Sequence, residues 1–424
     1  MRILFISEYF FPAIQGGGEL SAYYLAKHLA EQGEEVHVLT SRFKGLTEEE
    51  LLDGIHFHRL LQTGKNPRSF FSNIKRLFYP GSVQKNLRQL CAQYSFDIIH
   101  CMNMTSLSAV REKKGISAAF IAHVNSPLFL WPSGILTQEN IKEQPTFSNF
   151  VRDLLSAKQI GRLNYPSIVR YNPFAWWVIY QKFQKLRNNL TQFDAWVGIS
   201  PFITEKLMQQ GFPRQKIFVL PNIIPLDPFL TQPMQSYTPP RILYLGQFEQ
   251  FKGPHILLEA LAKIKIPYTC SLYGSGSLQT ALQEFIVREK LLATLRPDVA
   301  YSKVPQIVAQ HDLVVFPSLV ADAFGRVIVE AMAAGKPVIA SRIGGMQHII
   351  IDKKTGFLFT PGDTDELMQK ISLLLKNAAL RKKMGEQGRM AAKEYDPLNI
   401  TNEMIRIYGK VRHAGKDRKN NKRH

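Results

Sequence analysis

The sequence alternates short apolar runs with longer amphipathic segments, and it does so in two series along its 424 residues. The segment 19–32 has the pattern of a helix, because its apolar residues recur at helical spacing and Gly33 follows it. Strands that alternate with helices predict parallel sheets with helices on both faces. Strands are expected at 3–6, 35–40, 97–100, 118–122, 194–199 and 216–220 in the first series, and at 241–245, 269–273, 312–316, 337–340 and 356–359 in the second.

A proline-rich stretch separates the two series. Six prolines lie between Pro221 and Pro240. Proline fixes φ and removes a hydrogen-bond donor, so neither a helix nor a central strand can run through this stretch. The expected organisation is an N-terminal domain over 1–220, a linker over 221–240, a second domain over 241–396, a helix over 397–412 and a basic tail over 413–424.

The segment 125–189 interrupts the first series and is rich in aromatic and basic residues. We interpret it as a helical insertion that packs on the N-terminal half. Trp176 and Trp177, followed by Lys182 and Lys185, also suit an acceptor-binding or membrane-surface element, because aromatic side chains beside cations are typical of such interfaces.

Composition narrows the class of protein. Apolar residues make up 45% and charged residues 21%, which is typical of soluble globular proteins and excludes a disordered chain or a collagen-like fibre. A net charge of +19 favours an anionic partner, whether ligand phosphates, anionic lipid or nucleic acid. The three cysteines show no CxxC spacing, and no apolar run reaches the roughly 20 residues of a membrane span. These features favour a reducing, cytoplasmic location.

A glycine-rich loop ends the first strand–helix connection. Gly16, Gly17 and Gly18 precede the helix, and free amides at a helix start favour anions. A flexible turn is the alternative. A nicotinamide dehydrogenase would need its glycines directly after the strand and an acid at the end of the second strand; here that strand is followed by Ser41 and Arg42.

Two carboxylates follow the strand predicted at 312–316. Asp322 lies in the loop after it, and Glu330 lies eight residues later on the next helix. Ligands of doubly wound sheets bind at the carboxyl edge of the strands, and carboxylates there are natural acceptors for sugar and ribose hydroxyls. Glu330 could instead be a solvated helix residue, but its flanks, Val329 and Ala331, are apolar, and an unpaired carboxylate among them would be costly.

The stretch from Ala321 to Ser341 resembles the signature of family-four retaining glycosyltransferases of the GT-B fold. The resemblance extends over most of the chain, but the insertion at 125–189 lies largely outside it. It implies an α/β protein with two Rossmann-like, doubly wound parallel-sheet domains facing across a cleft. The N-terminal domain would bind the acceptor, the second domain the nucleotide sugar, and the helix at 397–412 would cross back to the N-terminal domain. The resemblance rests further on the motifs Gly16–Glu19, His123, Ser200, Pro221-Asn222, Leu245-Gly246, Lys252-Gly253, Tyr273–Gly276, Phe316–Ser318, Gly344-Gly345 and Lys354–Gly356.

The resemblance implies roles for individual residues. Lys252 would hold the donor diphosphate, where an ammonium offsets the charge on the leaving group. Glu330 would bind the nucleotide ribose, and Asp322 would contact sugar hydroxyls. His123 would face the reacting sugar, although a histidine at a strand end is otherwise more often a core residue. Backbone amides near the donor would come from Gly17, Gly18, Phe324 and Gly325.

The sequence departs from the family pattern at a few positions. Gln247 stands where the family usually has an arginine, so one cationic contact to the diphosphate is lost. Arg326 is one cation that could compensate. His348 replaces a common glutamate, and Ile223 and Pro225 replace glycine and aspartate.

The expected reaction is transfer of a sugar, with retention, from a nucleoside-diphosphate sugar to an acceptor hydroxyl in glycan, polysaccharide or glycolipid synthesis. No DxD pair lies in a suitable loop, so neither a metal nor a cofactor is expected. The acceptor would be a glycan or a lipid-linked sugar, at the inner membrane face if the basic surface binds anionic lipid. The alternatives are a nucleotide-sugar-binding protein without transfer activity and a GT-B sugar-nucleotide epimerase. No specific nucleic-acid module is recognisable.

Overall fold

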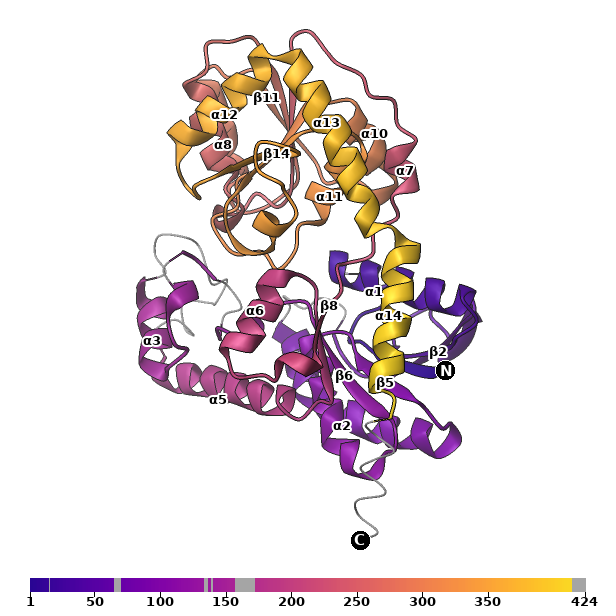
Figure 1. Cartoon of the computed structure of the whole chain (residues 1–424). Coiled ribbons are helices and arrows are strands. Elements are labelled where there is room, and N and C mark those ends of the chain that lie inside the picture. The colour runs from indigo at the N-terminus through magenta and orange to yellow at the C-terminus, as the bar shows by residue number, and fades with distance from the viewer. Residues whose placement is uncertain (15, 65–69, 133–135, 139, 157–171, 414–424) are drawn as a thin grey trace. The chain divides into compact units, whose positions relative to one another are not determined.

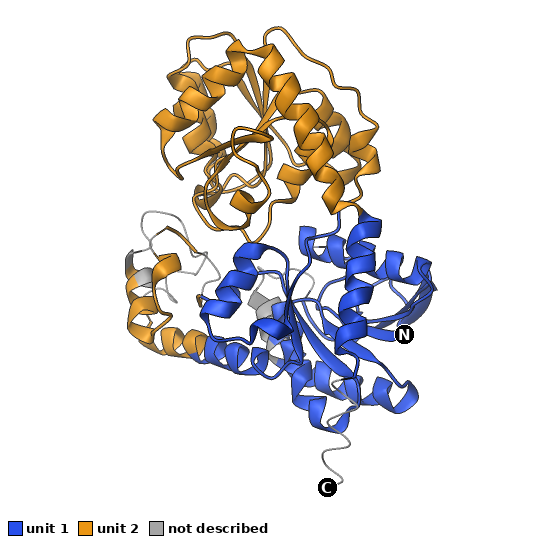
Figure 2. Ribbon diagram, in the orientation of Figure 1, with its two compact units in different colours: residues 1–130, 181–224, 397–424 blue, residues 131–180, 225–396 orange. Residues whose placement is uncertain are grey.

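The computed structural model describes residues 1–14, 16–64, 70–132, 136–138, 140–156 and 172–413. The chain divides into two compact units, coloured separately in Figure 2. Unit 1 comprises Met1–Leu130, Gln181–Ile224 and Pro397–His424, and unit 2 comprises Trp131–Tyr180 and Pro225–Asp396. The segment 125–189, assigned to the N-terminal half from sequence, is therefore divided between the units.

Unit 1 is built on an eight-stranded sheet with the order β3-β4-β2-β1-β5-β6-β7-β8. All neighbours pair in parallel except β3, which pairs antiparallel with β4. The strands are β1 Arg2–Ile6, β2 Glu35–Ser41, β3 Glu49–Leu52, β4 Ile55–Leu61, β5 Ile98–Cys101, β6 Ala119–Val124, β7 Ala195–Gly198 and β8 Ile217–Val219.

One face of this sheet is covered by α1 and α14, which contact each other (Figure 1). Ile3 and Phe5 of β1 share one hydrophobic cluster with Leu25 of α1 and with Met404 and Ile407 of α14. The C-terminal helix is therefore part of the core of unit 1. The α-helices of unit 1 are α1 Gly17–Glu31, α2 Phe70–Gln93, α6 Pro201–Gln209 and α14 Pro397–Val411. Helix α3 Phe147–Ser156 belongs to unit 2, and α5 Pro173–Leu190 has residues in both units.

Unit 2 has a six-stranded, wholly parallel sheet with the order β11-β10-β9-β12-β13-β14. Helices α8, α9 and α12 pack into one cluster with its strands, while α11 contacts α7 and α13. The strands are β9 Arg241–Leu245, β10 Thr269–Tyr273, β11 Ala293–Arg296, β12 Leu313–Phe316, β13 Val338–Ser341 and β14 Gly356–Phe359; the helices are α7 Asp227–Leu230, α8 Pro254–Ala262, α9 Gln279–Arg288, α10 Val304–Ala309, α11 Arg326–Ala333, α12 Thr364–Lys376 and α13 Ala378–Ala392.

Short 3-10 helices complete the connections. Cys91, Cys101 and Cys270 are free thiols. None of the described helices combines the length and apolarity needed to cross a bilayer. The 3-10 helices used below are η1 Met104–Gly115, η6 Gln250–Lys252, η7 Tyr301–Lys303 and η8 Gly344–His348.

Candidate active site

Lys252 and Asp322 form an ion pair at the carboxyl edge of the unit 2 sheet. The Lys252 Nζ donates to both carboxylate oxygens of Asp322, at 2.7 and 2.9 Å. Lys252 ends η6, after β9, and Asp322 lies in the loop after β12, which is the strand beside β9. The side chains are 20% and 23% exposed, so both charges remain accessible to a ligand.

Glycine at position 253 allows this pairing. Gly253 has a φ of +70°, a conformation that other residues rarely adopt. A Cβ here would lie 2.0 Å from the carbonyl oxygen of Pro317. The η6 turn therefore packs backbone to backbone against the end of β12, which brings Lys252 within reach of Asp322.

Glu330 is a buried carboxylate on α11, only 3% exposed. The Tyr301 hydroxyl donates to its Oε1 at 2.9 Å, and the Arg326 guanidinium lies 3.6 Å from the same oxygen. Among the described residues no hydrogen bond is recorded for Oε2. Burial raises the pKa of Glu330, and Arg326 and Tyr301 oppose that shift. The carboxylate is thus held by one oxygen, and the other is available to a ligand.

The backbone between these carboxylates is held by η8. The Gly345 amide donates to the Asp322 carbonyl at 2.7 Å. Gly344 has a φ of +63°, and a Cβ there would lie 2.5 Å from the same carbonyl oxygen. The amides of Phe324 and Gly325, which precede α11, donate to no acceptor within the described part of the chain. They are free to bind an anionic or hydroxyl oxygen at this helix start.

Gln247 has an exposed side chain directly after β9. The Tyr244 hydroxyl donates to the backbone carbonyl oxygen of Gln247 at 2.7 Å. The backbone of Gln247 is therefore fixed, while its side-chain amide is exposed to solvent. Arg326 pairs with Glu330 and donates to the Tyr301 hydroxyl at 3.2 Å, which directs it to the carboxylate. His348 is exposed at the end of η8.

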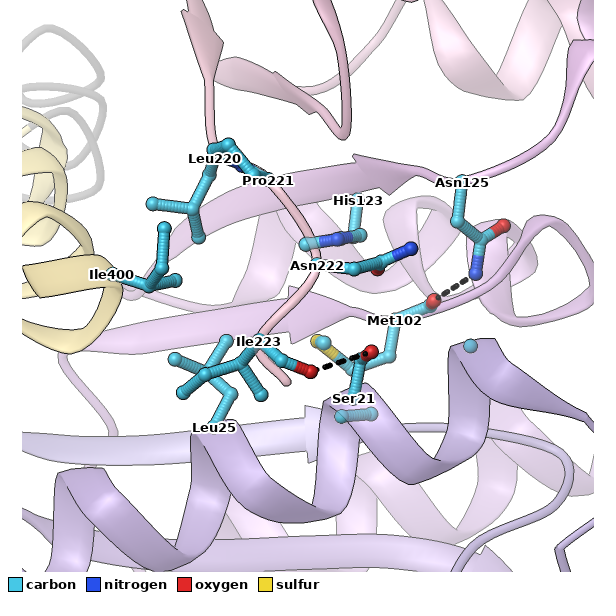
Figure 3. A pocket seen from close by; sticks show the side chains of 12 residues that line it. Ser21, Leu25, Met102, His123, Asn125, Leu220, Pro221, Asn222, Ile223 and Ile400 are labelled. Carbon is cyan, nitrogen blue, oxygen red and sulfur yellow. Dashed lines mark hydrogen bonds between the residues drawn. The ribbon is translucent and has the colours of Figure 1, made fainter. Parts of the chain in front are cut away.

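His123 lies in a small pocket of unit 1, shown in Figure 3. The pocket has a volume of about 10 Å³, room for roughly one water or one hydroxyl group. His123 is 5% exposed, and burial lowers its pKa to about 4, so the imidazole is neutral at pH 7. Its Nδ1 lies 3.3 Å from Nε2 of His100. The pocket lining also includes Gly18, Ser21, Met102, Asn125, Asn222 and Ile400.

The glycine loop contributes one of its two candidate residues to this pocket. Gly18 lines it, and a Cβ at Gly18 would lie 3.5 Å from the Nδ2 atom of Asn125. Gly17, the first residue of α1, is outside the lining. Asn125 donates to the Met102 carbonyl at 2.9 Å, which fixes its amide at the pocket wall (Figure 3).

The structure thus pairs Lys252 with Asp322. The Phe324 and Gly325 amides lie in the loop that also carries Asp322, and Glu330 lies on α11, the helix that follows this loop. Some participating residues were not identified from the sequence. Asn125 could have been, because it lies two residues after His123 at the same strand end. Tyr301 gave no signal, since only the fold brings η7 to α11.

Comparison with known proteins identifies the class. The model for "Glycosyltransferase Family 4" matches residues 15–228, just over half of the chain, and that for "Glycosyl transferases group 1" matches 232–391. The chain is 23% identical to the phosphatidyl-myo-inositol mannosyltransferase of Mycobacterium leprae, over 98% of each chain. An uncharacterized glycosyltransferase of Methanocaldococcus jannaschii is 34% identical over 36% of this chain and 43% of its own.

Solved structures agree on the fold. Sucrose-phosphate synthase from Thermosynechococcus elongatus superimposes with a TM-score of 0.73 at 20% identity, over 97% of this chain and 99% of that one. Anabaena HepE in complex with UDP-glucose gives 0.68 at 19% identity, over 97% and 100%. Fold and family matches together define a glycosyltransferase. More particularly, the chain belongs to glycosyltransferase family 4 and has the GT-B fold.

Proposed function

We propose that this protein moves a sugar, with retention of configuration, from a nucleoside-diphosphate sugar to an acceptor hydroxyl. The observation that carries the proposal is the buried carboxylate of Glu330, whose Oε1 is held by Tyr301 and Arg326 while Oε2 has no hydrogen bond to any residue that the structure describes. Burying a carboxylate costs free energy, so a site of this kind is best explained by a ligand whose hydroxyls bind it. The nucleotide ribose supplies such hydroxyls.

Lys252 would change partners when the donor binds. A diphosphate carries more negative charge than one carboxylate, so it competes with Asp322 for the ammonium of Lys252. Asp322 is then released to accept hydrogen bonds from the sugar, and Lys252 stabilises the charge that grows on the leaving phosphate. Amides of Phe324 and Gly325 would bind the sugar, and Gln247 would give the diphosphate a hydrogen bond without charge.

His123 would bind one hydroxyl of the reacting sugar. Its pocket has room for one small polar group, and its imidazole is neutral at pH 7. In the reaction, the bond from the anomeric carbon to the leaving phosphate oxygen breaks, and the bond to the acceptor oxygen forms on the same face. The acceptor proton passes to the leaving phosphate, so no side-chain base is required.

The test is turnover with product analysis. Anabaena HepE, which shares the fold, has been solved in complex with UDP and with UDP-glucose, so a donor panel starts with UDP-sugars. We expect release of nucleoside diphosphate that depends on an acceptor, and a product whose anomeric configuration by NMR is that of the donor. An inverted product, or a changed sugar still attached to its nucleotide, would exclude this reaction.

A second candidate, nucleotide-sugar binding without transfer, is favoured by Gln247. One cation that would stabilise the leaving diphosphate is missing, and Arg326 is committed to Glu330. This candidate predicts tight donor binding with no product from any acceptor. Gln247→Arg separates the two, because it should raise an existing rate but leave a pure binder inactive.

We further propose that the acceptor is a glycan or lipid-linked sugar at the cytoplasmic face of a membrane. Helix α5 carries Phe174 and Trp177, 69% and 53% exposed, and their rings stack 6.1 Å apart. Lys182 and Lys185 are exposed on the same helix, which has no acidic residue. Exposed aromatic residues with basic residues suit an anionic lipid surface.

Vesicle sedimentation tests this membrane proposal. The wild type should sediment with phosphatidylglycerol vesicles at low salt, and a Phe174→Ser/Trp177→Ser variant should remain in the supernatant. Phe78→Ser is the matched control, because Phe78 on α2 is also 69% exposed. Equal recovery of wild type with and without vesicles would refute membrane binding.

A further inference from the structure

A chain of buried hydrogen bonds leads from the C-terminal helix to His123. The Tyr408 hydroxyl of α14 lies 2.7 Å from Nδ1 of His100 on β5. Nε2 of His100 lies 3.3 Å from Nδ1 of His123 on β6. Tyr408 and His100 are both 0% exposed. The two histidines share one face of the sheet, because His100 pairs with Ile121 and His123 follows two residues later.

The chain can run in two directions, and these give His123 opposite tautomers. If the Tyr408 hydroxyl donates to His100 Nδ1, then His100 Nε2–H donates to His123 Nδ1. His123 then carries its own proton on Nε2. In the reverse direction, His123 Nδ1–H donates, His100 Nδ1–H donates to the Tyr408 oxygen, and His123 Nε2 is a bare acceptor.

The buried hydroxyl of Tyr408 needs an acceptor for its proton, and this need decides between the two directions. Within the described residues, His100 is the one hydrogen-bond partner recorded for the Tyr408 hydroxyl. In the reverse direction the hydroxyl proton would have no acceptor in a fully buried site, and an unsatisfied buried donor is costly. In the forward direction the Tyr408 hydroxyl and the His100 Nε2–H each have an acceptor. Burial also lowers the pKa of His100 and of His123, so both imidazoles stay neutral at pH 7.

We infer that Tyr408 and His100 are positioning residues that fix His123 as an Nε2–H donor. Nδ1 of His123 is occupied by His100, which leaves Nε2 for a ligand in the pocket. This inference rests on the proposed function for its meaning: His123 would donate to a sugar hydroxyl oxygen and could not act as a general base through Nε2. Tyr408 of the C-terminal helix, 308 residues from His100 in sequence, thereby sets the chemistry of a strand-end histidine.

The experiment reads the tautomer directly in the full-length protein without any substrate. The two nitrogens of a neutral imidazole differ strongly in 15N shift according to which one carries the proton. In protein labelled with 15N-histidine, His123 is assigned as the signal missing from His123→Asn. We expect the Nε2–H pattern, unchanged from pH 8 to pH 6. Tyr408→Phe, which removes one oxygen and keeps the ring, should shift His123 towards the other tautomer.

Tyr268→Phe is the matched control, since it removes a buried hydroxyl from unit 2 that donates to a carbonyl. It should leave the His123 signals unchanged. An Nδ1–H pattern in the wild type would overturn the inference by itself, even if Tyr408→Phe failed to fold. An unchanged pattern in a folded Tyr408→Phe would also overturn it.

Kinetics then separate this inference from the proposed function. If transfer is observed, Tyr408→Phe should lower kcat about tenfold with little change in the KM for the donor, since one oriented hydrogen bond is lost in the transition state. If no transfer is found but His123 shows the Nε2–H pattern, the tautomer assignment stands and the proposed function fails.

Discussion

At the scale of single residues, the protein buries ionisable groups at positions where burial of their charge lowers its stability. Glu330 is the clearest case, because burial raises its pKa despite the nearby Arg326 and Tyr301. The apolar flanks of Glu330 were enough to indicate burial from sequence. Its partner Tyr301 could not be found that way, because their contact depends on how η7 meets α11.

Glu330→Gln should therefore separate stability from binding. The folded-state pKa of Glu330 is raised, so its ionisation costs stability as pH rises through that pKa. At pH 7 the variant should melt at a higher temperature than the wild type, and the difference should shrink as pH falls towards 4.5, the ordinary pKa of a glutamate. Nucleotide-sugar affinity should fall, because ribose hydroxyls lose a charged acceptor. Glu289→Gln, an exposed change, should move neither melting nor affinity.

At the scale of elements, apolar runs located the central strands well. The strands predicted at 241–245, 269–273 and 356–359 are β9, β10 and β14 with the same bounds. The hairpin of β3 and β4 was missed, although Asp53-Gly54, both at positive φ, is a typical two-residue turn. Helix α2 was missed because it contains Pro80, and β11 because it is a half-exposed edge strand.

The turn between α11 and β13 contains a buried lysine, Lys336. Lys336 is 2% exposed, its Nζ donates to the Gln235 carbonyl at 3.2 Å, and burial lowers its pKa to about 8. Between pH 8 and 10.5 the unfolded state binds more protons, so stability from this group rises with pH. The melting temperature of wild type relative to Lys336→Met should therefore rise from pH 7 to pH 10. Lys263→Met, at an exposed site, should show no such trend.

Helix α14 should be as important to the stability of unit 1 as any internal element. Met404 is 0% exposed in the cluster with α1 and β1. Met404→Ala should lower the free energy of unfolding by about 2–5 kcal/mol, because it leaves a cavity in the core. Urea unfolding measures the change. Met390→Ala on α13, at a methionine 72% exposed, is the control and should have little effect.

At the scale of the whole molecule, the order of motifs carried more information than any one of them. Both sheets, the two family matches and the GT-B neighbours agree with the fold expected from that order. The antiparallel strand β3 is the departure from a purely parallel arrangement. The acceptor and the sugar could not be predicted, because the matched motifs name neither of them and the segment at 125–189 lies largely outside the resemblance.

The central claim is that unit 2 binds a nucleoside-diphosphate sugar through Lys252 and Glu330, and ligand-induced thermal shift tests it most directly. A ligand at 100 times its Kd stabilises the folded state by about 2.7 kcal/mol, a shift of several degrees. We expect one nucleotide to stabilise the wild type and the control Lys263→Ala, but neither Lys252→Ala nor Glu330→Ala. If no nucleotide stabilises the wild type, or if Lys252→Ala shifts as the wild type does, the account of this site is wrong.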